Sequence, residues 1–189
     1  MLKNLNPLRF IRRAVYRAKQ FVLALTLRLT DDDRAFIAAY LTIPEASLFK
    51  LMPDDEQKHS VMIAKKMLAA AHGSALKYDE AILAKIGLLH DVGKSAAKMS
   101  IIDRSTFVIV HRLFPSLYRR LASAGRKPDA RSFTRKAYVH KEHASIGAEA
   151  LRKAKTEERV VNIINAHDLP AASGDPVELM FLKKIDNEN

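Results

Sequence analysis

The sequence predicts an all-α protein. Apolar residues recur three or four positions apart along most of the 189 residues, which places them on one side of successive helices. No stretch shows the sustained alternation of apolar and polar residues that marks a half-buried strand. Proline, glycine and acidic residues divide the chain at intervals that suit helix starts and stops. The chain has no internal repeat, so we expect one helical bundle of ordinary domain size.

Residues 1–30 form the first predicted unit, a basic amphipathic helix. This segment has seven basic and no acidic side chains, and it therefore carries most of the chain's net charge of +11. Its apolar residues repeat at helical spacing: Leu8, Ile11, Val15, Ala18, Val22, Leu25 and Leu29. The apolar run is shorter than the roughly 20 residues of a spanning helix, and no small-residue cleavage site follows it. We expect this helix to pack on the body, with contact to an anionic membrane surface or a nucleic-acid backbone as the alternative.

Residues 31–189 are expected to form the second unit, a helical domain. An acidic first turn after Thr30 predicts a helix that continues through Tyr40. Pro44 suits the first turn of a short helix over 45–52. Pro53 opens a longer helix that Gly73 ends.

In the later part of the chain, the residues that start and end helices are less regularly placed. A helix from Asp79 is expected to end near Gly93, and a long helix over 103–123 has a kink or break at Pro115. The polar and basic segment 125–135 is the best loop candidate. Three last helices are predicted over 138–153, 156–167 and 176–187.

Composition narrows the chemistry. A hydrophobic fraction of 48% and a charged fraction of 28% are typical of a folded globular protein. The absence of cysteine excludes a disulfide scaffold, a thiolate metal site and a cysteine nucleophile, so any metal must be bound by nitrogen and oxygen. Residues 31–189 hold 25 basic and 21 acidic side chains, a balance that does not require a nucleic-acid partner. We expect a cytoplasmic protein, with a position at the membrane periphery as the alternative.

The most informative segment is Gly87–Lys94. An apolar helical run delivers His90 and Asp91 at its C-terminal end, and Gly93 and Lys94 follow. Imidazole and carboxylate together suit Mn, Fe, Zn or Ni better than Mg or Ca. The glycine permits a sharp turn, and the lysine places a cation beside a bound anion. A histidine taken singly is usually a packed or surface residue, so the other histidines decide the interpretation.

With these neighbours, the pattern resembles the HD-domain superfamily of metal-dependent phosphohydrolases. That family has a helical histidine, an adjacent His-Asp pair and a distant aspartate, which match His59, His90-Asp91 and Asp186. Members with a second metal add two intervening histidines. His143 matches the first, in a segment similar to the family's His-x-x-x-Gly-Ala helix start, and His167 matches the second. The resemblance covers about residues 55–189 and implies an HD-type helical bundle with a metal site in its central cleft.

The resemblance also implies a ligand set and its chemistry. The expected ligands of one or two divalent transition-metal ions are His59, His90, Asp91, His143, His167 and Asp186. A single ion needs only four of these ligands: His59, His90, Asp91 and Asp186. With two ions, Asp91 would bridge them, and we expect the second ion to bind more loosely because Asp168 stands where many members have a second histidine. Asp91 and Lys94 are the expected catalytic residues, the lysine stabilising charge on the phosphoryl group.

The implied reaction is hydrolysis of a phosphate ester of a nucleotide or related small molecule by metal-activated hydroxide. Motifs of the cyclic-di-GMP, alarmone and deoxynucleotide triphosphate hydrolases are missing from the sequence. Three alternatives remain: a nucleic-acid-directed phosphodiesterase using the basic arm, a di-iron oxygenase of the same superfamily, and a non-catalytic metal-stabilised interaction module. Among the other histidines, His72 is expected at a helix end and His111 in packing, while His140 is a less favoured ligand.

Overall fold

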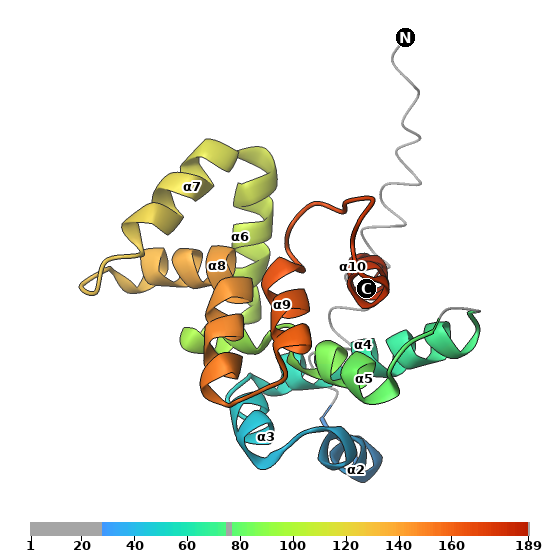
Figure 1. Cartoon of the computed structure of the whole chain (residues 1–189). Helices are drawn as coiled ribbons and strands as arrows, with labels where there is room; N and C mark the ends of the chain where they lie inside the picture. Colours follow the sequence, from blue (N-terminus) through green and yellow to red (C-terminus); the bar gives the residue numbers. More distant parts are fainter. Residues whose placement is uncertain (1–27, 75–76, 189) are drawn as a thin grey trace, which may run out of the picture.

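The computed structural model describes residues 28–74 and 77–188 (Figure 1). Within these residues the chain is all-helical, with no strand, as predicted. The predicted N-terminal helix lies outside the described residues, apart from positions 28–30, which are not helical. None of the helices in the described part of the chain is both long and apolar enough to cross a bilayer.

The first half contains four helices whose starts follow from local capping. Helix α2 (Asp31–Tyr40) begins with a capping box in which Thr30 and Asp33 satisfy each other's backbone N–H groups. Helix α3 (Ile43–Phe49) starts two residues before the predicted position. The long α4 (Asp54–His72) ends before Gly73 as expected. The carboxylate of Asp79 accepts from a backbone N–H in the first turn of α5 (Glu80–Leu89).

The second half corrects two predictions. The expected helix over 103–123 is two helices, α6 (Ile101–Leu113) and α7 (Pro115–Ala124), because Pro115 lacks an N–H and suits a helix start. The expected loop over 125–135 is shorter, because α8 (Ser132–Lys153) begins before the predicted Tyr138. Its first turns are held by tertiary packing, with the Phe133 ring 5.1 Å from that of Phe107. The remaining elements are a 3₁₀ helix, η1 (Val92–Ala96), and helices α9 (Glu158–Ala166) and α10 (Val177–Asn187).

The main core lies between α4, α5, α9 and α10. Helices α4 and α5 pack along each other, and α9 and α10 close the remaining sides (Figure 1). Fully buried side chains from these helices include Ile63, Met67, Leu83, Ile86, Leu88, Ile164 and Leu182. Burial of such side chains stabilises the fold by about 1.5–3 kcal/mol each.

A second, smaller core joins the α6–α7 hairpin to the first half of α8. It is formed by Phe107, Tyr118, Ala137 and Val139, together with Met99. The hairpin therefore stands beside the main bundle and contacts it mainly through α8 (Figure 1).

The backbones of η1 and α8 approach each other very closely. A Cβ at Gly93 would lie 1.9 Å from the carbonyl oxygen of His143 and 2.6 Å from the backbone nitrogen of Gly147. No real Cβ tolerates such distances, so the two elements can meet here because position 93 is glycine. A Cβ at Gly147 would be less severe, at 3.0 Å from the backbone nitrogen of Gly93. This contact fixes where the His90-Asp91 pair sits relative to α8.

We predict that Gly93→Ala lowers the free energy of unfolding by about 2 kcal/mol or more, because the added methyl group must force η1 away from α8. Urea unfolding of the metal-free protein measures this change. Gly174→Ala is the matched control, since nothing lies within 4 Å of a Cβ at that position. Equal stability of the two variants would contradict the packing described here.

Candidate metal centre

The structure brings all six predicted ligands together from five parts of the chain. His59 lies on α4, His90 and Asp91 follow α5, His143 lies on α8, His167 follows α9, and Asp186 lies in the last turn of α10. They form two adjoining groups, each with its ligand atoms within 4.8 Å of one another. The first group is His59, His90 and Asp186, and the second is Asp91, His143 and His167.

Three of the histidines have their Nδ1 atoms engaged by the backbone in the same way. The Nδ1 of His90 lies 3.0 Å from the carbonyl oxygen of Gly87, and that of His143 lies 3.0 Å from the carbonyl of His140. In His167 the corresponding distance to the carbonyl of Ile164 is 2.6 Å. Because a carbonyl only accepts, each Nδ1 carries a hydrogen and donates it. The Nε2 atom of each ring is therefore the one left to bind a proton or a metal.

These Nε2 atoms converge on a small volume. Those of His143 and His167 lie 3.2 Å apart, although two neutral imidazoles in this tautomer would direct lone pairs at each other. The Nε2 of His90 is completely buried and has no aligned hydrogen bond to any described residue. Its nearest acceptor is Oδ2 of Asp91 at 3.2 Å, and a buried polar atom without a well-aligned hydrogen bond is costly. A cation held among these atoms would satisfy them all, so the donor set fits a transition-metal ion.

Asp91 faces both groups. Its Oδ2 lies 3.2 Å from the Nε2 of His90, and its Oδ1 lies 3.3 Å from the Nε2 of His143. On the outer side, Asp186 accepts a hydrogen bond of 3.1 Å from the Nε2 of His59. The one carboxylate thus lies between the two sets of nitrogen donors.

In the protein without metal, protons take the place of the missing positive charge. Burial by itself would lower the pKa of His90, but the charge of Asp91 raises it to about 9. Burial would also lower the pKa of His143, but its hydrogen bond to Asp91 outweighs this effect, and the pKa is raised. The pKa of His167 is lowered to about 4 by burial and by the charges of His143 and His90. Burial works against it, yet the charges of His90 and Lys94 hold the pKa of Asp91 well below its ordinary value.

Lys94 is held at the edge of the centre rather than in solvent. Its Nζ lies 2.6 Å from Oδ2 of Asp91 and 3.3 Å from Oε2 of Glu56. Burial alone would lower the pKa of Lys94, but these carboxylates raise it, so the side chain stays charged. Glu56 is in turn paired with Arg104, which also contacts Asp55.

Glu56 and Arg104 are the residues of this network that the sequence did not identify. Glu56 belongs to an acidic first turn, which is explained by the helix dipole alone. Arg104 lies 48 positions later on α6, and no local pattern connects the two. Only the tertiary fold brings this pair to Lys94.

The structure assigns the other histidines to packing or to the rim. His140 belongs to neither donor group; its Nδ1 accepts a 2.6 Å hydrogen bond from the hydroxyl of Tyr118, and burial lowers its pKa to about 4. His72 ends α4 beside Tyr78, as expected. His111 is exposed, unlike the packed residue that the sequence predicted, and its ring stacks on that of Tyr118.

The second donor group differs from expectation in one detail, and the structure also places Asp168 beside it. His143 lies in the middle of α8 rather than at a helix start, because the helix begins at Ser132. Asp168 lies at the rim of this group, with Oδ2 3.3 Å from Nδ1 of His143 and Oδ1 3.7 Å from Nε2 of His167. Its half-exposed carboxylate therefore adds negative charge beside the two histidines.

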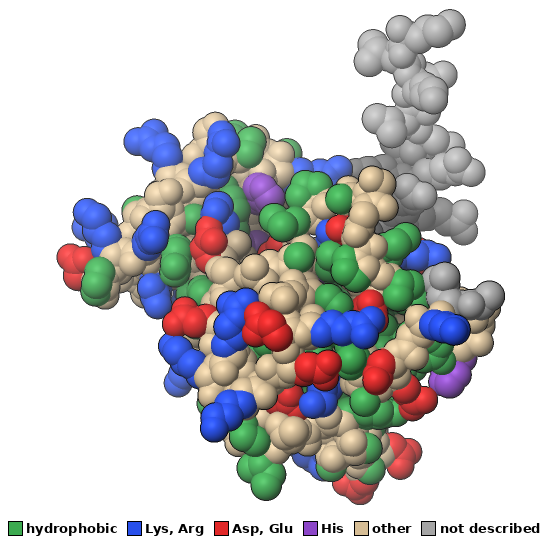
Figure 2. Space-filling view, in the orientation of Figure 1, with side chains coloured by type: hydrophobic (Ala, Val, Ile, Leu, Met, Phe, Trp, Pro, Cys, Tyr) green, Lys and Arg blue, Asp and Glu red, His purple; other side chains and the backbone are tan. Residues whose placement is uncertain are grey.

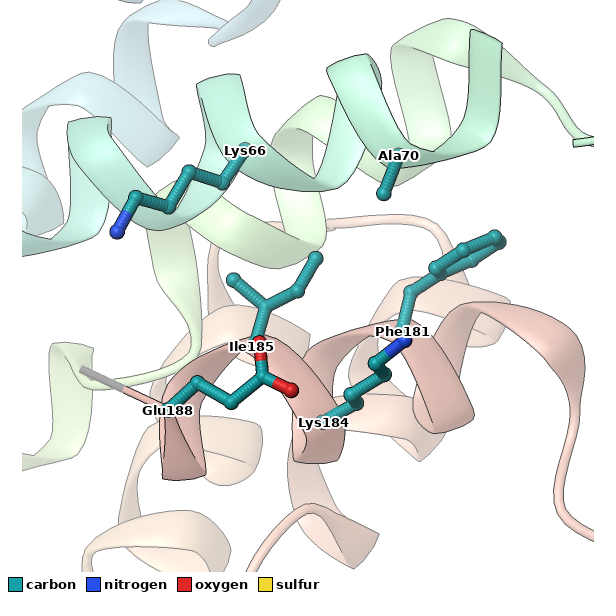
Figure 3. A pocket seen from close by; sticks show the side chains of 6 residues that line it. All are labelled: Lys66, Ala70, Phe181, Lys184, Ile185 and Glu188. Atoms are coloured by element: carbon teal, nitrogen blue, oxygen red, sulfur yellow. The ribbon is translucent and has the colours of Figure 1, made fainter. Parts of the chain in front are cut away.

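Neither of two shallow recesses on the surface contains a predicted ligand. The first is lined by Ser116, Arg119, Arg120 and Ser123 of α7. The second lies between α4 and α10 and is lined by Lys66, Ala70, Phe181, Lys184, Ile185 and Glu188 (Figure 3). The candidate centre lies within the bundle, where His90, Asp91, His143 and His167 are buried and His59 and Asp186 are partly exposed at its edge.

The fold and this geometry define an all-α protein with a buried histidine and aspartate centre suited to divalent metals. The sequence model of the HD domain matches residues 57–188, a span that contains all six predicted ligands. The chain therefore belongs to the HD domain family, which indicates the superfamily of metal-dependent phosphohydrolases. Neither the comparison with curated proteins nor that with solved structures gave a match.

We predict that Mn²⁺ binding releases protons at pH 7 and becomes tighter as the pH rises toward 9. His90, with its pKa near 9, holds a proton on Nε2 in the metal-free protein, and the metal must displace it. Calorimetric titrations in two buffers with different ionisation enthalpies give the number of protons released. Identical heats in both buffers would contradict the raised pKa.

Proposed function

We propose that this protein is a divalent-metal-dependent phosphohydrolase that cleaves a phosphate ester of a nucleotide or related small molecule. The observation that carries the proposal is the position of Asp91 between the two donor groups. Its two oxygens approach His90 on one side and His143 on the other, at 3.2 and 3.3 Å. A carboxylate shared in this way suits a pair of ions that act on one phosphoryl group.

The six residues divide naturally between two ions. His59, His90 and Asp186 would hold the first, His143 and His167 the second, and Asp91 both. Divalent ions bound there supply hydroxide near neutral pH by lowering the pKa of their water, and they neutralise charge on phosphoryl oxygens. Nitrogen and oxygen donors in this proportion favour Mn, Fe, Ni or Zn over Mg.

Lys94 contributes in two ways in this proposal. Its ammonium group fixes Oδ2 of Asp91 at 2.6 Å, so it orients the shared carboxylate. The same positive charge lies next to the centre and would stabilise the developing charge of the phosphoryl group. Glu56 and Arg104 hold Lys94 in this position through the ion pairs described above.

We expect protein purified without added metal to contain transition metal, and to hydrolyse members of a phosphate-ester panel in the presence of Mn²⁺. Asp91→Asn should lower kcat by about 100-fold or more, because the neutral amide cannot serve both donor groups as an anion. His72→Ala is the matched control, since this exposed histidine at the end of α4 lies in neither donor group. Full activity of the Asp91 variant would refute the assignment. Iron accompanied by oxygen consumption, without hydrolysis, would favour the oxygenase alternative.

The number of ions gives a separate test. Replacing His143 or His167 by Ala should lower bound metal from about two ions per chain to about one and reduce kcat, because the second set of donors is lost. His59→Ala should disturb the first ion instead. Elemental analysis of the three variants separates these cases. Wild-type protein that saturates at one Mn²⁺, with both second-group variants near wild-type turnover, would contradict a two-ion centre.

A further inference from the structure

The positive charge of the described structure is concentrated in one part of it. Residues 101–136, here called the basic lobe, comprise α6, α7, the following loop and the first turn of α8. They contain nine basic and two acidic side chains, whereas the rest of residues 31–189 contains 16 basic and 19 acidic ones. The lobe is therefore strongly positive on a body that is slightly negative.

Most of this charge faces solvent. Arg104 and Lys136 form ion pairs with Glu56 and Asp103. Six other basic residues are exposed and make no ion pair with a described residue: Arg112, Arg119, Arg120, Arg126, Lys127 and Arg131. Figure 2 shows Lys and Arg side chains spread over this side of the molecule.

The same lobe exposes large apolar side chains at its corner. All seven residues from His111 to Leu117, where α6 meets α7, are exposed. Leu113, Phe114 and Leu117 have exposed fractions of 63%, 58% and 48%. Exposed apolar residues rimmed by charge mark an interaction site more often than chance exposure does.

A recess on α7 adds a place for a phosphate group. It has a volume of about 470 Å³ and is lined by Ser116, Arg119, Arg120 and Ser123. Two guanidinium groups and two hydroxyls provide donors that match phosphate oxygens. This recess is on the same helix as the exposed Leu117, so a broad surface that contacts α7 would reach both features.

Charge decides between the possible occupants. A second copy of this lobe would bring the same excess of positive charge, and residues 1–30 contain no acidic side chain. Both would be repelled, so the partner must be anionic. A nucleic-acid backbone would satisfy the arginines but leave Leu113, Phe114 and Leu117 in water. An anionic bilayer accepts both kinds of side chain, because apolar groups enter below the headgroups that bind the basic ones.

We propose that the basic lobe docks on the surface of an anionic lipid bilayer, with the corner between α6 and α7 inserted and Arg119 and Arg120 on lipid phosphates. Tyr118 of the same hairpin bonds to His140, one helical turn before His143. The docked hairpin is thus in contact with the part of α8 that carries His143, and the lobe contains none of the six predicted ligands.

Sedimentation of the full-length protein with vesicles tests this surface. Vesicles of phosphatidylcholine with about 30 mol% phosphatidylserine should bind the protein, and vesicles of phosphatidylcholine alone should not. Arg119→Gln with Arg120→Gln should lower the partition coefficient about 5-fold for each charge removed. Phe114→Ser with Leu117→Ser should lower it about 10-fold or more.

Matched changes elsewhere serve as controls. Lys50→Gln with Lys155→Gln removes two exposed charges outside the lobe, and Ile43→Ser with Met180→Ser removes two exposed apolar side chains. Both should bind vesicles as the wild type does. Hairpin variants that bind as the wild type does would overturn the proposal. It would also fail if duplex DNA bound more tightly than the vesicles and only the arginine variant lost that binding.

A fluorescent label gives a second measurement that does not depend on these variants. Because the chain has no cysteine, Ser116→Cys introduces a single labelling site at the corner. An environment-sensitive dye there should shift to shorter wavelength with phosphatidylserine vesicles and be quenched by brominated lipid. The same dye on Ser47→Cys, in the exposed part of α3, should do neither. Equal responses at both positions would overturn insertion of the hairpin.

Discussion

The close contact between η1 and α8 is the constraint on which the centre depends. Asp91 lies two residues before Gly93, and the carbonyl oxygen of His143 lies where a Cβ of Gly93 would be. Any larger residue would separate the two elements and, with them, the carboxylate from the histidines of α8 and α9. The glycine of the His-Asp-x-Gly-Lys segment therefore lets η1 and α8 pack closely together. Its φ is not positive, so the sharp turn expected from the sequence is not what requires glycine at this position.

The candidate centre is arranged for binding at some cost to the fold. Three imidazoles and a carboxylate are buried together. In the metal-free protein, the negative charge of Asp91 is balanced by Lys94 and by protons on His90 and His143, whose pKa values it raises. A chain of ion pairs extends from the centre to α6: Lys94 pairs with Glu56, and Glu56 pairs with Arg104. The hairpin and the centre are thus connected by ion pairs as well as by the Tyr118–His140 hydrogen bond.

Local sequence signals predicted most helices of the fold. The features that the sequence did not predict depend on contacts between segments far apart in the chain. Thr30, Asp79 and Gly73 mark helix ends through their own backbone preferences, so those boundaries were readable from sequence. Residues 132–136 are mostly polar or basic, yet they form the first turn of α8, where Phe133 packs on Phe107 and Lys136 pairs with Asp103. The six ligands came from a family resemblance, whereas Glu56 and Arg104 share no local pattern. The exposed corner at Phe114 could not be predicted, since exposure depends on what the fold leaves uncovered.

The carbonyl groups that hold the Nδ1 atoms of His90, His143 and His167 have a consequence for how this centre can change over time. Side-chain partners of a metal-binding histidine are lost by a single substitution, and the ring is then free to rotate. Here each partner is the main chain three residues earlier, which every amino acid provides. The identity of the side chains at positions 87, 140 and 164 therefore does not set the tautomers; the helical backbone does. Position 87 is restricted for another reason, because a Cβ there would lie 2.5 Å from the Cα of Ala64 on α4. The orientation of these rings is thus inherited with the packing of the helices.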